Sequence, residues 1–299
     1  MAPNVSKLRL LDLPYLPLME VLYHMSPFEL FSIKCKYLNK IIKSFGSRIS
    51  AQYKLSVEFT SIRRISFESE NKSYPCRWLA KASELAHFQE ILKMHEKILE
   101  TWGPMKTKAV FDLGIDKECS SMMFEWAQKY KDSIEEVVLR DKTNSDEPTI
   151  LLKFVDFFKN CDAMHIDAGD GFQCDHIKLN NRFLKIENGK WITVENLWNF
   201  QCEMIMVSSP LSLQNKEITQ FLKEWKTRAK INSKLVCLSF VKGSLDINKI
   251  LMSLDHFVME VPNYATPVRG ILMDGNDEKR VYIVEKIFDG KLIICMMFN

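Results

Sequence analysis

Hydrophobic residues near the start of the chain recur with the spacing of short helices. Four of them fall at i, i+3, i+4 and i+7 after Pro17 and therefore share one helical face: Leu18, Val21, Leu22 and Met25. Ser26-Pro27 then predicts the cap and first position of a second short helix, which ends near Ile33. A third helix is predicted by the next apolar stripe, which consists of Leu38, Ile41, Ile42, Phe45 and Ile49.

The next fifty residues change from strand to helix periodicity. Residues 55–59 and 62–67 alternate apolar with polar positions, which predicts two short strands. Residues 85–102 then carry an amphipathic helical pattern that ends before Gly103-Pro104. His95 lies on the apolar stripe of this helix, where we expect a packed histidine rather than a ligand.

From Ala109 onward, short apolar runs alternate with helical stretches. The runs are centred on Phe111, Val138, Ile166, Ile205 and Leu238, with separations of 27, 28, 39 and 33 residues. Helical patterns lie between them in three stretches, at residues 122–130, 150–158 and 215–225. One strand, one helix and two turns occupy about this length, so the pattern predicts parallel strands with right-handed connections through helices.

The period of 27–28 residues lies in the leucine-rich-repeat range, although the asparagine ladder and the strict L-x-x-L-x-L pattern of that family are missing. We therefore predict a leucine-rich-like strand–helix array, with a doubly wound sheet as the alternative. Beyond it, residues 268–273, 281–287 and 292–298 read as three strands joined by Asp-Gly turns. An antiparallel meander of these strands would close the array and cover its last edge.

Composition and charge narrow the class of protein. The chain has 299 residues, a formal net charge of +3 and eight cysteines, and no two of them form a C-x-x-C pair. Neither a disulfide scaffold nor a zinc finger is indicated. The start of the chain has no leader pattern and no window is apolar enough to cross a membrane, so we expect a cytoplasmic or nuclear protein that contacts no membrane.

The positive charge is concentrated in residues 1–54, which contain eight Lys and Arg residues and only three acidic residues. Such an excess favours an acidic partner, either a protein surface or nucleic acid. Nucleic acid is not expected as a partner, because only the lysines of the third helix could form a basic patch, and a solvated helical face explains them equally well.

The first fifty residues resemble an F-box. The resemblance is carried by Leu13-Pro14, by Val21-Leu22, by Met25-x-Pro27-x-Glu29-Leu30-Phe31 and by the lysine-rich third helix. F-boxes attach substrate receptors to the acidic adaptor of cullin-type ubiquitin ligases. The resemblance implies that the following residues pack on the adaptor or brace that surface: Leu13, Pro14, Leu18, Pro27, Leu30 and Phe31.

A second resemblance lies farther along the chain. The stretch Ser212-Leu213-x-Asn215-Lys216-Glu217-Ile218-x-x-Phe221-Leu222-x-x-Trp225 is similar to the F-box-associated domain of the large nematode-type F-box family. The two resemblances imply an F-box at residues 8–54, linking strands and a helix at 55–105, and an F-box-associated substrate-binding domain at 106–299. The expected fold class is α+β or α/β, with a small three-helix F-box followed by a leucine-rich-like strand–helix array that an antiparallel meander closes.

Candidate chemistry is sparse. The densest set of ligand-type residues comprises His165, Asp167, Asp170, Cys174, Asp175 and His176. These side chains could ligate zinc or a hard cation, but their spacing matches no recognised metal motif, and a solvated loop at a strand end explains them better. Gly169-x-Gly171 is not a phosphate loop, and no cysteine carries the local signature of a nucleophile.

These observations favour a non-catalytic receptor that has no cofactor and no metal. In that hypothesis, residues 8–54 bind the acidic adaptor and, through it, the cullin, while the C-terminal domain binds a protein substrate whose identity the sequence does not give. The alternatives are a leucine-rich-like interaction module acting outside any ligase and a metal-dependent hydrolase built on the 165–176 cluster.

Overall fold

The computed structural model describes residues 13–33, 36–69, 76–79, 84–114, 117–141, 149–174, 177–227, 233–252, 254, 256–261, 268–274 and 280–298. The chain divides into two compact units. Unit 1 comprises residues 1–58 and 62–107, and unit 2 comprises residues 59–61 and 108–299. Among the described residues, no helix is both long enough and apolar enough to cross a membrane.

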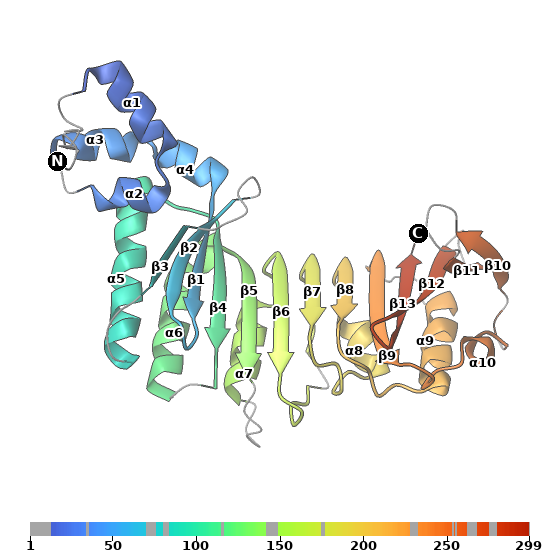
Figure 1. Ribbon diagram of the computed structural model, residues 1–299. Coiled ribbons are helices and arrows are strands. Elements are labelled where there is room, and N and C mark those ends of the chain that lie inside the picture. The colour runs from blue at the N-terminus through green and yellow to red at the C-terminus, as the bar shows by residue number, and fades with distance from the viewer. Residues whose placement is uncertain are drawn as a thin grey trace, which may run out of the picture. The chain divides into compact units, whose positions relative to one another are not determined.

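Unit 1 begins with two short helices, α1 (Tyr15–His24) and α2 (Pro27–Ser32) (Figure 1). The predicted cap of α2 is confirmed as a capping box. The Ser26 amide donates to Glu29 Oε2 at 2.7 Å, and the Glu29 amide donates to Ser26 Oγ at 3.4 Å. Helices this short are marginally stable alone. Leu18 and Leu22 of α1 and Leu30 of α2 are buried, so packing of the apolar side chains stabilises both helices.

The predicted third helix is broken into two, and the expectation of one continuous helix is wrong. Residues 36–44 form α3 (Lys36–Ser44), and α4 (Gly46–Gln52) follows after Phe45. The break lies where the backbone approaches α5 closely. A Cβ at Gly46 would lie 2.8 Å from the carbonyl oxygen of Trp102, so only glycine allows this approach. The break could not be predicted from the apolar stripe, because buried apolar residues continue at helical spacing on both sides of it.

The remainder of unit 1 is an antiparallel three-stranded sheet and a long helix. The strands are β1 (Lys54–Phe59), β2 (Arg64–Glu68) and β3 (Cys76–Leu79), and the helix is α5 (Glu84–Trp102). The predicted strands at 55–59 and 62–67 and the predicted helix at 85–102 are confirmed, and His95 is buried as expected. Strand β3 was not predicted.

Trp102 joins these parts of unit 1. Its indole Nε1 donates to the carbonyl of Ile42 at 3.1 Å, and its ring lies 5.8 Å from that of Phe31 and 5.6 Å from that of Phe67, measured between centroids. The helices α2 and α3 and the strand β2 therefore share one aromatic core at the carboxyl end of α5.

Unit 2 is a mixed α/β unit built on one sheet, in which strands β4 to β9 lie side by side in chain order. These strands are β4 (Thr107–Asp112), β5 (Ile134–Asp141), β6 (Ala163–Ala168), β7 (Phe183–Ile186), β8 (Met204–Val207) and β9 (Leu235–Val241). Strands β5 to β9 are parallel, as the alternation of strand and helix predicted.

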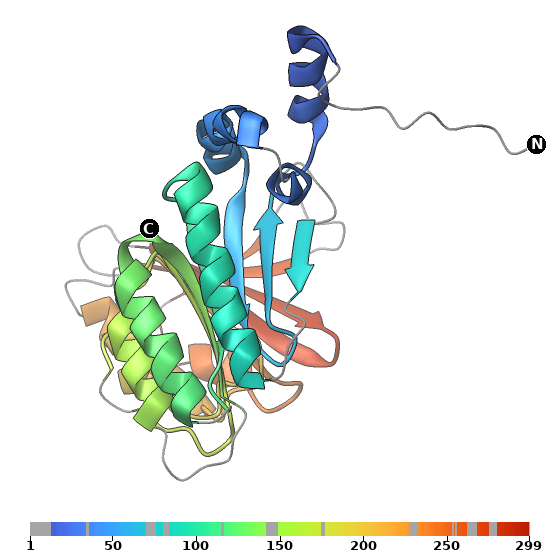
Figure 2. The ribbon, with the colours of Figure 1, turned by 90° about the vertical axis from the view of Figure 1, so that its left-hand side faces the viewer.

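The helices of this sheet cover one of its faces (Figures 1 and 2). They are α6 (Lys117–Tyr130), α7 (Thr149–Phe158), α8 (Val194–Asn199) and α9 (Asn215–Thr227), with the 3-10 turn η2 (Lys131–Ser133) after α6. A doubly wound sheet has helices on both faces and a reversal of strand order, so the structure differs from that alternative. The leucine-rich-like description remains a prediction.

The long interval between the runs at Ile166 and Ile205 contains two elements that were not predicted. The four-residue strand β7 and the one-and-a-half-turn helix α8 both lie there. Helix α8 begins with a capping box, in which the Asn196 amide donates to Thr193 Oγ1 at 3.2 Å and Asn196 Oδ1 accepts from the Thr193 amide at 2.9 Å. A helix this short contains too few apolar positions to show a helical period, so the sequence pattern did not predict it.

The antiparallel tail is confirmed. Strands β11 (Val268–Asp274), β12 (Arg280–Phe288) and β13 (Lys291–Phe298) form a meander, and β13 pairs antiparallel with β9. Asp289 and Gly290 form the β12–β13 turn with φ values of 49° and 70°, as a two-residue hairpin requires. Helix α10 (Ile247–Leu251) and strand β10 (Phe257–Val261), which pairs with β11, were not predicted.

Candidate binding surface on the uncovered face of the sheet

The face of the sheet opposite the helices has no covering layer among the described residues (Figure 1). Burial alternates strictly along β6, β7 and β8, so that every second side chain packs beneath the helices and the others reach the second face. We call this second surface the open face. It is formed by Ala163, His165, Asp167, Phe183, Lys185, Glu187, Met204, Met206, Leu235, Cys237, Ile293, Cys295 and Met297.

Strand register arranges the open face in rows that run across the sheet. The central row contains, in order, His165, Lys185, Met206, Cys237 and Cys295. Its first two members are polar and the remaining three are apolar or weakly polar. The open face therefore has a charged half over β6 and β7 and an apolar half over β8, β9 and β13.

The apolar half is hollowed. A depression of about 630 Å³ lies over β8, β9, β12 and β13, and Met206, Cys237, Ile293 and Cys295 are among the residues that line it. Met206 is 36% exposed, and Phe288 at the rim is more exposed still. Methionine is flexible and polarizable, so a surface rich in it can adapt to different apolar side chains. An extended peptide or an exposed helix of another protein has the dimensions to contact such a surface.

The charged half is held together by Glu187. Lys185 Nζ donates to Glu187 Oε1 at 2.6 Å, and His165 Nε2 lies 3.1 Å from the same oxygen. Partial burial raises the pKa of Glu187, but the hydrogen bond and charge of Lys185 outweigh it, so the carboxyl pKa lies below its usual range. The carboxylate therefore stays ionised and holds Lys185 by a hydrogen bond, while the His165 ring lies beside it.

The titration of His165 should make unit 2 less stable in mild acid. Burial, and then the charge of Lys185, lower the pKa of His165 from its ordinary value of 6.5, although Glu187 opposes them. The unfolded chain therefore binds a proton at this histidine more readily, and the free energy of unfolding falls as the pH drops below 6.5. We expect urea titrations to show a smaller loss of stability below this pH in His165→Gln than in the wild type. Equal losses would contradict the assignment.

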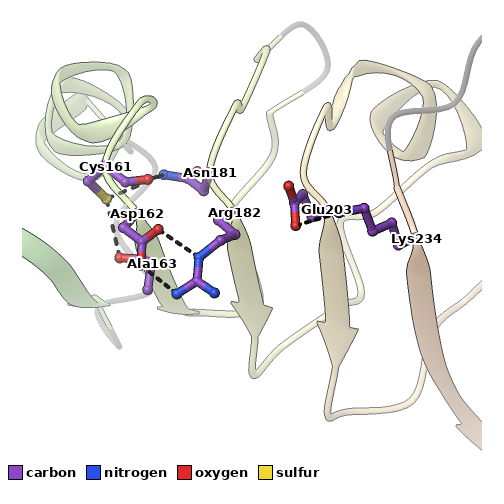
Figure 3. Close-up of polar contacts among 7 residues, drawn as sticks. All are labelled: Cys161, Asp162, Ala163, Asn181, Arg182, Glu203 and Lys234. Atoms are coloured by element: carbon purple, nitrogen blue, oxygen red, sulfur yellow. Dashed lines mark hydrogen bonds and ion pairs between the residues drawn. The ribbon is translucent and has the colours of Figure 1, made fainter.

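Alternating charges line the entry to four consecutive strands (Figure 3). Asp162, Arg182, Glu203 and Lys234 each stand one position before β6, β7, β8 and β9. Arg182 binds both oxygens of Asp162, at 2.8 and 2.9 Å, and Lys234 Nζ lies 3.2 Å from Glu203 Oε2. Asp162, and more weakly Glu203, raise the pKa of Arg182. We call this series the charge ladder.

The charge ladder is accompanied by backbone bonds that fix register. The amide of Phe183 donates to the Asp162 carbonyl at 3.0 Å, and the amide of Met204 donates to the Arg182 carbonyl at 3.0 Å. The Lys234 amide donates to the Glu203 carbonyl at 2.7 Å. The ladder residues are largely exposed, so we assign them a role in strand order and not in chemistry.

A buried asparagine closes the turn before β6. Asn181 is 1% exposed, and its Nδ2 donates to the carbonyls of Cys161 at 2.8 Å and Phe158 at 3.2 Å. Asn181→Ala would remove the side-chain donor to the Cys161 carbonyl and leave the Phe158 carbonyl with the Cys161 amide alone, so we expect it to lower the free energy of unfolding by about 1–3 kcal/mol. The exposed neighbour Asn180 is the matched control, and Asn180→Ala should change stability by no more than about 0.5 kcal/mol in urea titrations. Similar losses in both variants would contradict the role of Asn181.

The described residues among those considered as metal ligands do not converge on one point. Asp170 accepts from Lys190 Nζ and from Asn188 Nδ2, each at 2.8 Å, and these bonds lower its pKa. Asp167 and Asp170 line a depression of about 550 Å³ at the carboxyl ends of the strands, whereas Cys174 is buried. Asp175 and His176 lie outside the described residues. In the part of the chain that is described, no three His, Cys, Asp or Glu side chains are placed to hold a metal ion.

In unit 1, the residues predicted for adaptor binding divide into two groups. Leu18, Pro27 and Leu30 are buried and brace the helices. Leu13 and Phe31 are half-buried, and Pro14 is exposed. Phe31 also contacts the ring of Trp102 within unit 1.

A set of exposed apolar residues on α1 was not singled out from the sequence. We call it the α1 outer face, and it consists of Tyr15, Leu16 and Tyr23. Leu16 is 77% exposed, and Tyr23 is covered on one side by the guanidinium of Arg48, which lies 4.2 Å from its ring centroid. The sequence does contain a signal for this surface, because large apolar residues that lie off the buried stripe of a short helix are expected to be exposed.

Comparison with known families agrees with part of this description. A family model described as F-box associated matches residues 158–240. The matched segment runs from the end of α7 to β9 and contains the charge ladder and most of the open face. No curated protein matches the chain, and no solved structure does. Unit 2 thus contains a region that matches the F-box-associated family model, and this match is consistent with a protein-interaction role.

Proposed function

We propose that this chain is the substrate-recognition subunit of a cullin-type ubiquitin ligase. In this proposal the helices of unit 1 bind the acidic adaptor and the open face of unit 2 binds the target protein. The observation that carries the proposal is the F-box-associated match, since residues 158–240 contribute strands β6 to β9 of the open face. The F-box resemblance of residues 8–54 supplies the adaptor-binding half.

The chemistry of the open face suits a protein target. Its apolar half offers a hollow whose lining combines methionine, cysteine and aliphatic side chains with Lys286, Asp289 and Lys291, and its charged half offers fixed groups on Lys185 and Glu187. An apolar centre with charges to one side is the usual anatomy of a surface that binds another protein. The charged half would select the orientation of a segment bound in the hollow.

No catalytic group is required of the chain itself. A receptor that holds its target close to the ligase's conjugating enzyme raises the effective concentration of the target's lysines there. Transfer of ubiquitin would then depend on the position of the open face within the assembled ligase. The subunit would need no cofactor and no metal.

Adaptor binding is tested with the purified full chain and the purified acidic adaptor. We expect the wild type to bind in a pull-down and Leu13→Ala/Pro14→Ala to lose binding, with circular dichroism unchanged. Absence of binding by the wild type would refute the ligase assignment. In that case, target binding by unit 2 would support the interaction module acting outside any ligase.

Target binding is tested on the open face. Met206→Glu places a charge in the lining of the hollow on β8, and Met252→Glu places the same charge on an exposed methionine at the end of α10. We expect proteins crosslinked to the wild type in cells to be lost from Met206→Glu and retained by Met252→Glu, while all three bind the adaptor equally. Loss from both variants, or from neither, would refute the role of the open face.

A further inference from the structure

Two cysteines meet at the floor of the open face although 58 residues separate them in the chain. Cys237 lies on β9 and Cys295 lies directly opposite on the antiparallel strand β13. Their Sγ atoms are 2.7 Å apart, and both side chains line the hollow of the apolar half. Both residues are partly exposed, so small solutes can reach them.

The backbone geometry is compatible with a covalent bond between these residues. Directly opposite residues of antiparallel strands have Cα atoms about 4.5–5.5 Å apart, and disulfides span about 4.4–6.8 Å between Cα atoms. The two strands pair from Lys291↔Val241 to Met297↔Leu235. The sheet therefore holds the thiols together without any rearrangement of the chain.

The surroundings also make the two thiols chemically unequal. The Cys237 thiol donates a hydrogen bond to Cys295 Sγ, which lowers the pKa of Cys295, and the charge of Lys286 lowers it further despite partial burial. The same bond and burial raise the pKa of Cys237. Elsewhere in unit 2, burial raises the pKa of Cys161 and of Cys202 to about 12. Thiolate character is thus concentrated on Cys295, in a solvent-accessible hollow.

We propose that Cys237 and Cys295 form a reversible oxidation site, at which a peroxide converts the two thiols into a disulfide linking β9 to β13. The Cys295 thiolate attacks one peroxide oxygen, the O–O bond breaks, and a sulfenic acid and hydroxide form. Cys237 then attacks the Cys295 sulfur, the S–S bond forms, and the sulfenic oxygen leaves as water. In total, two thiols and one hydrogen peroxide give one disulfide and two waters. A small thiol reverses the reaction by exchange.

The proposal stands independently of the ligase assignment, because it requires only the pairing of β9 with β13. Its effect would fall on the open face, since the disulfide would fix the two strands beneath the hollow and remove the thiolate beside Lys286. The chemical groups at the base of the hollow would therefore differ between the oxidised and the reduced protein.

The test uses the folded full chain, hydrogen peroxide and peptide mass spectrometry. After oxidation, free thiols are blocked and the protein is digested with trypsin without reduction. Cleavage after Lys234, Lys242 and Lys291 releases Cys237 in peptide 235–242 and Cys295 in peptide 292–299. We expect these two peptides to be recovered linked and to separate after dithiothreitol. Recovery of both peptides with blocked, unlinked cysteines would overturn the proposal.

Two controls test the role of the fold and the order of the steps. Oxidation in guanidinium chloride should scatter disulfides among the eight cysteines, and an equal yield of the 235–242/292–299 pair there would overturn the proposal. In Cys237→Ser, a cyclic diketone probe should trap sulfenic acid on Cys295 at least about fivefold more than on Cys237 in Cys295→Ser. The reverse ratio would overturn the assignment of Cys295 as the attacking thiol. Cys202→Ser, which changes a buried thiol, should form the disulfide like the wild type.

Discussion

Replacing Leu16 with aspartate is expected to weaken the proposed binding of the acidic adaptor about 100-fold, because loss of a central apolar contact costs an interface about 2–4 kcal/mol. Leu16 is 77% exposed on the α1 outer face, so the substitution disturbs no packing within unit 1. Its place in the first turn of α1 also tolerates a carboxylate, since the amino end of a helix favours negative charge. Titration calorimetry with purified adaptor gives the change in affinity directly.

The matched control is Ile62→Asp. Ile62 is also a large exposed apolar residue of unit 1, at 62% exposure, and the substitution changes the net charge by the same amount. An interaction governed only by long-range charge would be weakened about equally by both variants. A selective loss in Leu16→Asp would locate the adaptor on the α1 outer face, and equal affinities for the wild type and Leu16→Asp would refute that location.

Truncation of Trp102 to alanine is expected to lower the free energy of unfolding of unit 1 by about 3–5 kcal/mol. The residue is 5% exposed, and its ring contacts Phe31 and Phe67, so the variant would leave a large cavity between helices and sheet. It would also remove one of the two donors to the Ile42 carbonyl, which keeps its hydrogen bond from the Phe45 amide. Amide hydrogen exchange in α5 reports on unit 1 separately from unit 2.

Trp102→Phe separates these two contributions. Phenylalanine keeps most of the ring contacts but loses the indole donor, so the expected loss is about 1–2 kcal/mol. Loss of all protection in α1 to α4 while α5 remains protected would show that the first helices depend on this contact more than the long helix does. A loss below about 1 kcal/mol in Trp102→Ala would contradict its central place in the core.

Periodicity predicted most elements of both units and missed several of the short ones. The stripe of α5 and the runs that became β4, β6 and β9 are long enough to distinguish a period of 3.6 from a period of 2. Strand β8 has only four residues but is apolar throughout, whereas the four residues of β7 include Lys185 and α10 has only five residues, so neither of these two gave a clear signal. The break between α3 and α4 depends on the approach of Gly46 to Trp102, a contact between residues far apart in the sequence.

The candidate site was harder to predict than the fold, because it depends on which face of each strand the helices cover. Strand β8 has apolar residues on both faces, so Met206 gave no sign that its side chain would be exposed. The adjacency of Cys237 and Cys295 follows only from the antiparallel register of β13 with β9. In contrast, the stretch around α9 already carried the likeness to the F-box-associated family, because its aromatic stripe is local in sequence.

The charge ladder has a consequence for how a sheet of this kind can grow or shrink during evolution. Its signs alternate from strand to strand, from Asp162 through Arg182 and Glu203 to Lys234. Loss of the single unit that ends in β7 would bring Asp162 beside Glu203, two like charges on neighbouring strands. Loss of two successive units would bring Asp162 beside Lys234 and restore attraction. We therefore expect the sheet to tolerate the gain or loss of two neighbouring strands more readily than the gain or loss of one. The number of strands beneath the open face would then tend to change in steps of two.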